Sequence, residues 1–114
     1  MATPRPGRRV RGSRTGRPIM ALLDLIGRRW SLRILWELRE GPQNFRDLQA
    51  RAGGISPSVL NTRLKELREA RLVASSTSEG YKLTAEGAAL GAALQPLNRW
   101  ADRGGRRLSG RGGD

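Results

Sequence analysis

Short polar side chains recur at helical spacing in the middle of this sequence, and their chemistry suits hydrogen bonding to a polar surface. The central members of the group are Ser58, Asn61, Thr62 and Lys65. Asn can pair with adenine through two hydrogen bonds, Ser and Thr can bond several base edges, and Lys suits a phosphate. We therefore interpret the group as a face that contacts nucleic acid. The alternative is a helix face that is only solvated.

The residues around this group predict the helix that positions it, over residues 56–70. Ser56 is a good N-cap, and Pro57 falls at the first helical position, where its missing N–H costs nothing. Ile55 and Leu60 can close over each other as a hydrophobic staple. The repeating apolar residues are Leu60, Leu64 and Leu67. Because they recur at i, i+4 and i+7, they mark one buried face, and at about 100° per residue the polar group points away from it.

Other polar residues are candidates for contacts with phosphates. Ser56 is a cap first, although the free amides at the start of its helix can also hold a phosphate. Arg63 lies beside the leucine face, which favours a structural or phosphate role over base reading. The candidates elsewhere in the chain are Asn44, Arg46, Ser76, Ser78 and Lys82. For these residues, capping or simple solvation is the alternative.

Basic charge is concentrated at the two ends of the sequence. The 114 residues include 22 Lys+Arg and 10 Asp+Glu, for a formal net charge of +12. Residues 1–17 hold six arginines and no acid, and residues 99–114 hold five arginines and two aspartates. Base-composition bias explains the excess of arginine over lysine, but not the scarcity of acids at the ends. Basic ends on a nearly balanced body predict a polyanionic partner such as DNA or RNA.

The composition excludes several kinds of chemistry. Because the sequence has no cysteine and no histidine, disulfides, thiolate nucleophiles, zinc fingers and imidazole catalysis are ruled out. Glu66 and Glu69 lie on one helix turn, where pairing with neighbouring basic side chains is expected. No phosphate-cradling glycine motif or metal-ligand cluster appears, so we predict no enzyme activity and no cofactor. No stretch approaches about 18 apolar residues and the start lacks a secretory apolar core, so we expect a soluble cytoplasmic protein without a membrane partner.

Periodicity and turn signals divide the chain into three parts. Residues 1–17 are too poor in apolar side chains to fold, and we expect a disordered basic arm there. One domain is expected over residues 18–103, followed by a disordered Gly/Arg tail over residues 104–114. Helices are predicted over residues 19–26, 30–39, 44–52, 56–70 and 84–103, with strands at residues 72–77 and 81–83.

Local signals define the ends of these elements. Gly27 is expected to end the first helix in a left-handed conformation. Asn44 can cap the third helix, and Gly53-Gly54 breaks it. Pro96 is expected to kink or shorten the last helix. Two short helices joined by a tight glycine turn, with a hairpin directly after them, predict a mainly α fold with a small β-wing, a winged helix-turn-helix.

Apolar faces outside the central helix also carry predictions. The helix over residues 19–26 is apolar almost all round, so it must be covered on more than one side, which predicts a partner subunit. The next helix is predicted to bury Trp30, Leu32, Ile34, Leu35, Trp36 and Leu38. Core packing is the expectation for all three tryptophans, Trp100 included, and Tyr81 is expected to pack against the domain. A small-ligand pocket with Trp30 or Trp36 in its wall is a further hypothesis.

Short motifs follow one another in a fixed order along residues 18–103. They are Asp24-Leu25-Ile26-Gly27-Arg28-Arg29-Trp30, Ile34-Leu35, Gly41-Pro42, Phe45-x-Asp47-Leu48, Gly54-Ile55-Ser56-Pro57, Leu60-x-x-Arg63-Leu64, Leu67, Leu72-Val73 and Leu83-Thr84-x-x-Gly87. Each motif is weak by itself, but the ordered series at this spacing is specific. The series resembles the HxlR-type winged helix-turn-helix transcriptional regulators.

The resemblance implies a homodimeric bacterial DNA-binding regulator, cytoplasmic and nucleoid-associated. It implies that the helix after Ser56 enters the major groove and that the wing touches the backbone or the minor groove. The first and last helices would build the dimer interface, with Leu22, Leu23, Ile26, Leu90, Leu94, Leu97 and Trp100 as its expected residues. The expected partner is double-stranded DNA with two inverted half-sites about one helical turn apart. A small-molecule effector is left open.

The sequence departs from the family pattern at several points. Many members carry a cysteine just before the first helix, which some use as a redox or electrophile sensor, so its absence here excludes cysteine sensing. The wing is several residues shorter than usual. Arg71 follows the recognition helix where glycine is frequent, at a cost on the order of 1 kcal/mol. Ser58 stands where a basic residue is common, so base contacts rest mainly on Asn61, Thr62 and Lys65.

Two other functions are compatible with the sequence. One is a non-specific architectural DNA- or RNA-binding protein that uses a basic winged helix, and the other is a winged helix that binds only proteins. A specific regulator prefers its site to bulk DNA by about 10³-fold or more, whereas an architectural protein does not. A protein-interaction module shows no salt-dependent binding to DNA at all.

Deleting residues 1–17 tests whether the arm binds DNA. Because the deletion removes six arginines, the slope of log affinity against log salt should become shallower by about 0.9 for each phosphate that the arm neutralises. Fluorescence anisotropy on one duplex over a series of salt concentrations measures the slope for the full chain and the deletion variant. Equal slopes for the two would show that the arm takes no part in binding.

Overall fold

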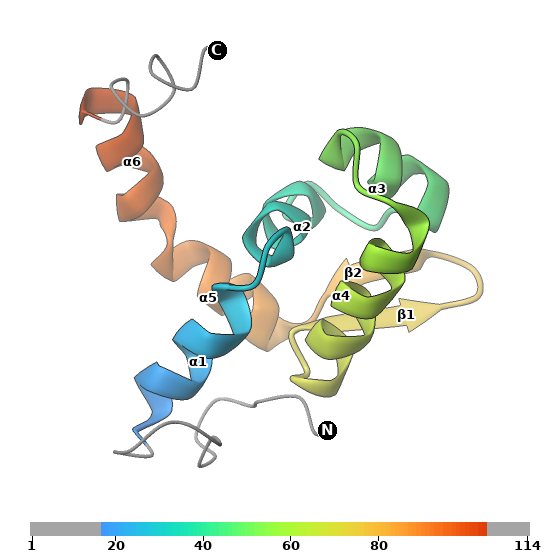
Figure 1. Cartoon of the computed structure of the whole chain (residues 1–114), viewed down its shortest axis with the longest axis horizontal. Helices are drawn as coiled ribbons and strands as arrows, with labels where there is room; N and C mark the ends of the chain where they lie inside the picture. The colour runs from blue at the N-terminus through green and yellow to red at the C-terminus, as the bar shows by residue number, and fades with distance from the viewer. Residues whose placement is uncertain (1–16, 105–114) are drawn as a thin grey trace.

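Six helices and one antiparallel pair of strands make up residues 17–104, the range that the computed structural model describes (Figure 1). In chain order they are α1 Pro18–Ile26, α2 Ser31–Leu38, α3 Phe45–Ala52, α4 Pro57–Glu69, β1 Val73–Ser76, β2 Gly80–Leu83, α5 Ala85–Ala93 and α6 Gln95–Gly104. The predicted winged helix-turn-helix is confirmed. Most of the expected arm and tail, residues 1–16 and 105–114, lies outside the described residues. Within residues 17–104, no helix is long and apolar enough to cross a membrane.

In the connection between α1 and α2, the left-handed backbone occurs at Trp30 and not at Gly27. Gly27 has a right-handed backbone with φ −76°, so the prediction of a left-handed helix end there is wrong. Trp30, which the periodicity places inside α2, instead precedes that helix with φ 80°. Its half-buried ring packs against the core, and the guanidinium of Arg29 lies 5.4 Å from the ring centroid. This packing offsets a backbone cost of about 1–3 kcal/mol.

The two helices of the helix-turn-helix begin at the predicted caps. The side chain of Asn44 accepts a hydrogen bond from the Asp47 N–H at 2.8 Å, and the hydroxyl of Ser56 accepts one from the Val59 N–H at 3.2 Å. Between α3 and α4, Gly53 and Gly54 have φ 76° and 93°. Glycine adopts this left-handed region without steric cost, so the chain can turn sharply and start α4 at once.

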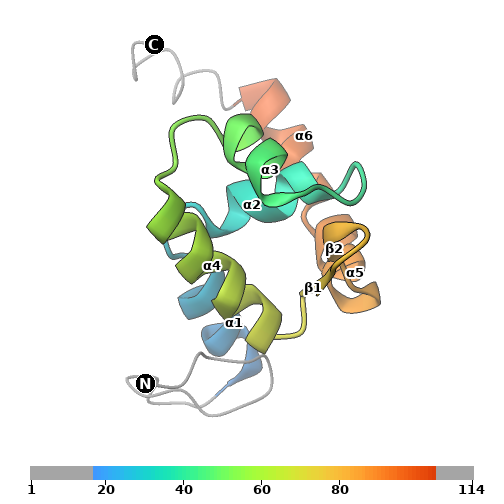
Figure 2. The same ribbon diagram turned by 90° about the vertical axis from the view of Figure 1, so that its right-hand side faces the viewer.

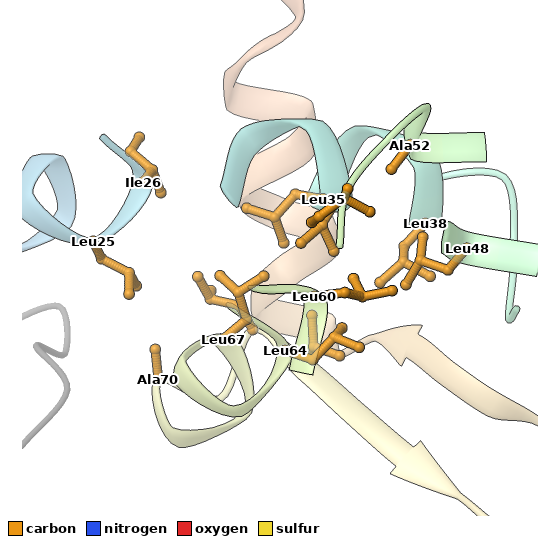
Figure 3. Close-up of a cluster of buried hydrophobic side chains, with 14 residues drawn as sticks. Leu25, Ile26, Leu35, Leu38, Leu48, Ala52, Leu60, Leu64, Leu67 and Ala70 are labelled. Carbon is orange, nitrogen blue, oxygen red and sulfur yellow. The ribbon is translucent and has the colours of Figure 1, made fainter. Parts of the chain in front are cut away.

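The rotation of α4 about its own axis is fixed by three leucines. Leu60, Leu64 and Leu67 are 0%, 1% and 0% exposed. They join one buried cluster with side chains of the first three helices, shown in Figure 3. Those side chains are Leu25, Ile26, Ile34, Leu35, Leu38, Leu48 and Ala52. Each fully buried leucine contributes roughly 1.5–3 kcal/mol, so the face opposite the leucines is held toward solvent.

The end of α4 feeds directly into the wing. Arg71 has φ 64°, as expected for the position where relatives often have glycine. The Leu72 N–H donates to the Leu67 carbonyl at 3.0 Å, and the Arg71 N–H donates to the Arg68 carbonyl at 2.9 Å. These two bonds form a Schellman cap, which satisfies helix carbonyls that would otherwise lack donors. Leu72 and Val73 then continue the buried cluster into β1.

The wing is a short hairpin, as predicted, and it is tied to the start of α3. β1 and β2 pair from Val73↔Leu83 to Ser76↔Gly80. Gln43 and Tyr81 exchange two backbone hydrogen bonds of 2.9 and 2.8 Å. A Cβ at Gly80 would lie 2.5 Å from the Gln43 carbonyl oxygen. The close approach of the two backbones therefore requires glycine there, and Tyr81 packs against the domain as expected.

The last helical region is two helices, because the chain breaks at Leu94 before Pro96. Thr84 caps α5 by accepting from the Gly87 N–H at 3.0 Å. Leu94 ends α5, and α6 starts at Gln95 and extends away from the body of the domain (Figure 1). Pro96 is expected to kink or shorten the last helix, and the structure has two successive helices that meet just before it. No residue of α6 is buried.

Two apolar residues expected in the core lie at the surface instead. Leu32 is 37% exposed and Trp100 is 46% exposed, so the prediction of core packing is wrong for both. The buried stripe of α2 consists of Ser31, Ile34, Leu35 and Leu38. Leu32 lies outside this stripe of i, i+3, i+4 and i+7 positions. Trp100 is carried away from the core by α6, whereas Trp30 and Trp36 are half-buried.

Two glycines of α5 provide a matched test of the packing between α5 and the turn that joins α4 to β1. A Cβ at Gly87 would lie 2.1 Å from the Leu72 carbonyl oxygen, while a Cβ at Gly91 would meet nothing within 4 Å. Gly87→Ala should therefore lower the free energy of unfolding by about 1–3 kcal/mol. Gly91→Ala should raise it by roughly 0.5–1 kcal/mol, the gain of alanine over glycine in a helix. Urea unfolding followed by circular dichroism measures both. A Gly87→Ala variant as stable as Gly91→Ala would contradict the close approach.

Candidate nucleic-acid interface

The outer face of α4 presents the polar residues that the sequence singles out. Ser58, Asn61, Thr62 and Lys65 are all exposed. In Figure 1, α4 lies beside β1, and in Figure 2 its N-terminal end projects from the domain next to the turn from α3. The start of the helix, where short polar side chains concentrate, is therefore its most accessible part.

A hollow separates this face from the wing. It is lined by Asn61, Thr62, Lys65, Arg68, Glu69, Val73 and Ser75. Arg68 and Ser75 were not among the candidates from the sequence. Arg68 could have been found, because positions 61, 65 and 68 repeat the i, i+4, i+7 spacing of one helix face. Ser75 becomes a neighbour of α4 only through the packing of the wing, which no local pattern indicates.

The polar groups on α4 differ in how far they are already engaged. The Thr62 hydroxyl donates to the Ser58 carbonyl at 3.0 Å, which leaves its oxygen lone pairs as acceptors. The Ser56 hydroxyl is occupied as the helix cap. Within residues 17–104, Asn61 and Lys65 make no side-chain hydrogen bond or ion pair. Their donors and acceptors are thus available for a ligand at no cost in intramolecular bonds.

Arg63 is turned inward, away from this face. Its Nε donates to the Arg29 carbonyl at 2.8 Å, and its Nη1 donates to Glu66 Oε1 at 3.0 Å. Its side chain is 21% exposed. Of the two roles that the sequence favours for Arg63, the structural one matches these bonds.

The candidates outside α4 lie at the start of α3 and on the wing. Arg46 and Ser78 are exposed, whereas Asn44 uses its side-chain oxygen as the cap of α3. The Ser76 hydroxyl accepts from the Glu79 N–H at 2.9 Å, which shapes the turn of the wing. Lys82 pairs with Glu79 at 3.1 Å, but both side chains are about half exposed. Such a pair is worth little in water, so Lys82 can exchange it for a phosphate.

The candidate residues thus fall into two groups, one on the outer face of α4 and one at the start of α3 and on the wing. The outer face of α4 offers amide, hydroxyl and ammonium groups, and the α3 start and the wing offer a guanidinium, hydroxyls and a second ammonium. The backbone bonds between Gln43 and Tyr81 join the α3 start to β2. Within residues 17–104, no cluster of three or more potential metal-ligating His, Cys, Asp or Glu residues occurs.

Large exposed apolar side chains occur on α1, α2 and α6. They are Ile19, Met20, Leu23, Leu32, Leu97 and Trp100. α1 and α6 project from the side opposite to α3 and the wing (Figure 1). Of the expected dimer residues, Leu23, Leu97 and Trp100 are exposed there. The others, Leu22, Leu90 and Leu94, are half-buried, and Ile26 is in the core.

A cleft lies between α2 and the two last helices. Trp36, Leu94 and Leu97 line it, with small side chains of α5 on its floor. Arg39 also lines the cleft, and its guanidinium lies over the Trp36 ring, 3.8 Å from the ring centroid. Trp36 thus lies in the wall of this cleft, while Trp30 lies at a separate hollow beside Arg28 and Arg29.

Comparison with known proteins agrees with this geometry. Residues 25–108 match the model of the HxlR-like helix-turn-helix family. The chain is 34% identical over 86 residues to the HTH-type transcriptional regulator YodB of Bacillus subtilis, an alignment that covers 70% of this chain and 77% of YodB.

Solved structures show the same fold. The structure of quinone-bound YodB from B. subtilis superposes with a TM-score of 0.69 at 34% identity, covering 75% of this chain and 96% of the other. A possible HxlR family transcriptional factor from Thermoplasma volcanium superposes with a TM-score of 0.68 at 31% identity, covering 75% of this chain and 82% of the other. With its buried leucines, caps and wing all in the expected order, this chain belongs to the HxlR-like helix-turn-helix family of transcriptional regulators.

Proposed function

We propose that the chain binds double-stranded DNA as a homodimer and regulates transcription from an operator with two inverted half-sites. The observation that carries the proposal is the outer face of α4, whose Asn61 and Lys65 have free hydrogen-bonding groups while the opposite face is buried. In this proposal α4 enters the major groove, and Asn61, Thr62 and Lys65 read base edges with Ser58 beside them.

The groups flanking α4 bind the phosphate backbone. Arg46 and Asn44 at the start of α3, and Ser76, Ser78 and Lys82 on the wing, hold the two sides of the groove. Arg68, at the wing side of α4, is a further phosphate-binding residue that we add to this set. The amides capped by Ser56 face the same ligand. A protein that binds chromosomal DNA in this way would work in the cytoplasm, on the nucleoid.

The second subunit covers the apolar side chains of α1 and α6. Exposed Leu97 and Trp100 on a helix with no buried residue are costly in water, and a second copy of the same face buries them symmetrically. Two copies related by a two-fold axis present two recognition helices, which accounts for inverted half-sites about 34–36 Å apart.

A small-molecule effector in this chain acts without a thiol. YodB has been solved with a bound quinone, whereas the present sequence contains no cysteine. An effector would therefore bind without forming a thiol adduct, and the cleft beside Trp36 is the site we favour, since it lies between α2 and the helices of the proposed dimer face. We propose no enzymatic reaction.

Asn61→Ala tests base reading. A bidentate contact with adenine discriminates by about 1–3 kcal/mol, so the variant should lose that much affinity for a duplex selected by the wild-type chain from a random library. Binding to a scrambled duplex should stay close to wild type. Electrophoretic mobility shift with both duplexes at one salt concentration gives the comparison.

Arg46→Ala is the matched control for phosphate binding, because its loss should weaken binding to both duplexes alike. An equal loss on both duplexes for Asn61→Ala would remove Asn61 from base reading. If the wild-type chain selects no sequence from the library, it is the architectural protein that its net charge of +12 also suits.

The dimer face is tested by placing charge on α6. Leu97→Glu combined with Trp100→Glu should give a folded monomer of 12.5 kDa, because both side chains are about half exposed in one subunit and buried in the proposed pair. Sedimentation equilibrium measures the mass, with wild type expected at twice the monomer. Thr77→Glu on the wing turn is the charge control and should stay dimeric. A double variant that remains dimeric would place the interface elsewhere.

A further inference from the structure

Glu66 joins α4 to the connection between α1 and α2. One carboxylate oxygen, Oε2, accepts from Arg28 Nη1 at 2.9 Å, and the other, Oε1, accepts from Arg63 Nη1 at 3.0 Å. The side chain of Glu66 is only 17% exposed. Glu66 is thus a partly buried carboxylate whose two oxygens both accept from arginines, one on α4 and one in the connection between α1 and α2.

A second bond joins the same two segments. Arg63 Nε donates to the backbone carbonyl of Arg29 at 2.8 Å. Arg63 and Glu66 lie one turn apart on α4, so the helix holds residues 28 and 29 through two side chains at once. We call these two bonds, with the Arg63–Glu66 pair between them, the α4 clamp.

The α4 clamp differs from an ordinary surface ion pair. Its members are 28%, 17% and 21% exposed for Arg28, Glu66 and Arg63, whereas the Lys82–Glu79 pair on the wing is about half exposed. Partly buried, charge-assisted bonds with both oxygens engaged are stronger and more directional than isolated exposed pairs. The clamp therefore restrains the position of α4 as well as adding stability.

The α4 clamp connects two different regions of the domain. Its α4 end lies on the helix that carries Asn61 and Lys65, and its other end follows α1, which carries exposed Leu23 on the apolar side of the domain. Two charge-assisted bonds thus join α4 to the segment that directly follows α1. Hydrogen bonding to base edges needs placement to within about 0.5 Å, while attraction to phosphates tolerates larger shifts.

We propose that Glu66, through Arg28 and Arg63, is a positioning residue that sets the orientation of the recognition helix relative to α1 and so determines sequence specificity without touching DNA. The inference rests on the proposed function, because it takes α4 as the recognition helix. It goes beyond that function by assigning specificity to a residue that faces the interior of the domain.

Electrostatics and positioning predict opposite outcomes when Glu66 is neutralised. Glu66→Gln raises the net charge by one unit, which by attraction alone strengthens binding to any DNA. Loss of position, in contrast, weakens binding only where base edges are read. The variant should therefore bind the duplex selected by the wild-type chain about tenfold more weakly, as expected for a residue that couples to the recognition face. Its affinity for a scrambled duplex should be unchanged or increased.

Glu37→Gln is the matched control. Glu37 is also 17% exposed and also accepts from an arginine, Arg33 at 2.8 Å, but both residues lie on α2. The control has the same charge change and removes a similar bond, so it should keep the preference for the selected duplex. Thermal unfolding of both variants reports their stability separately from binding. If Glu37→Gln loses as much preference as Glu66→Gln, the effect is one of stability and the inference is overturned.

Arg63→Lys provides a second variant with no change of charge. Lysine cannot donate to Glu66 and to the Arg29 carbonyl with the geometry of a guanidinium, so the preference for the selected duplex should again fall. Arg28→Gln, alone and combined with Glu66→Gln, completes a double-mutant cycle in which the two losses should be less than additive.

Two failures can be told apart. If the wild-type chain prefers no duplex from the library, the proposed function fails. If the wild type has a preference that Glu66→Gln and Arg63→Lys both retain, only the positioning role is wrong.

Discussion

The burial of one face of α4 is the constraint on which the rest of the structure depends. Three leucines with almost no exposed surface fix the rotation of the helix, and the whole polar face follows from that rotation. At roughly 1.5–3 kcal/mol for each leucine, this term outweighs any single polar contact of the helix. The caps and glycine turns decide where the helix starts, while the leucines decide which way it faces. The α4 clamp then adjusts an orientation that the core has already selected.

Those parts of the fold that depend on neighbouring residues could be predicted from the sequence. Asn44 and Ser56 are caps because a short acceptor precedes a helical repeat, and the break before Pro96 follows from the missing N–H of proline. The exposed positions of Asn61 and Lys65 follow from the leucine repeat alone. In each case the determining interaction lies within about four residues along the chain, which is the range over which a sequence pattern is informative.

The features that the sequence did not predict all depend on distant parts of the chain. The left-handed backbone of Trp30 is stabilised by packing in the core, and the pairing of Gln43 with Tyr81 joins segments that are far apart in sequence. The apolar residues of α2 are compatible with more than one buried helix face, so the sequence alone also places Leu32 in the core. Packing against the rest of the domain determines which face is buried. Arg63 and Ser75 acquire their neighbours in the same way.

The junction at Leu94 between α5 and α6 determines the direction of α6. Because α6 buries none of its own residues, its direction is set by the few bonds at that junction and not by the core. Substitutions near residues 94–96 can swing α6 without disturbing the helix-turn-helix. In the proposed dimer, in which α6 forms part of the interface, a small change in the direction of α6 changes the distance between the two copies of α4. The distance between the two copies of α4 and the residues on its outer face can then change independently of each other.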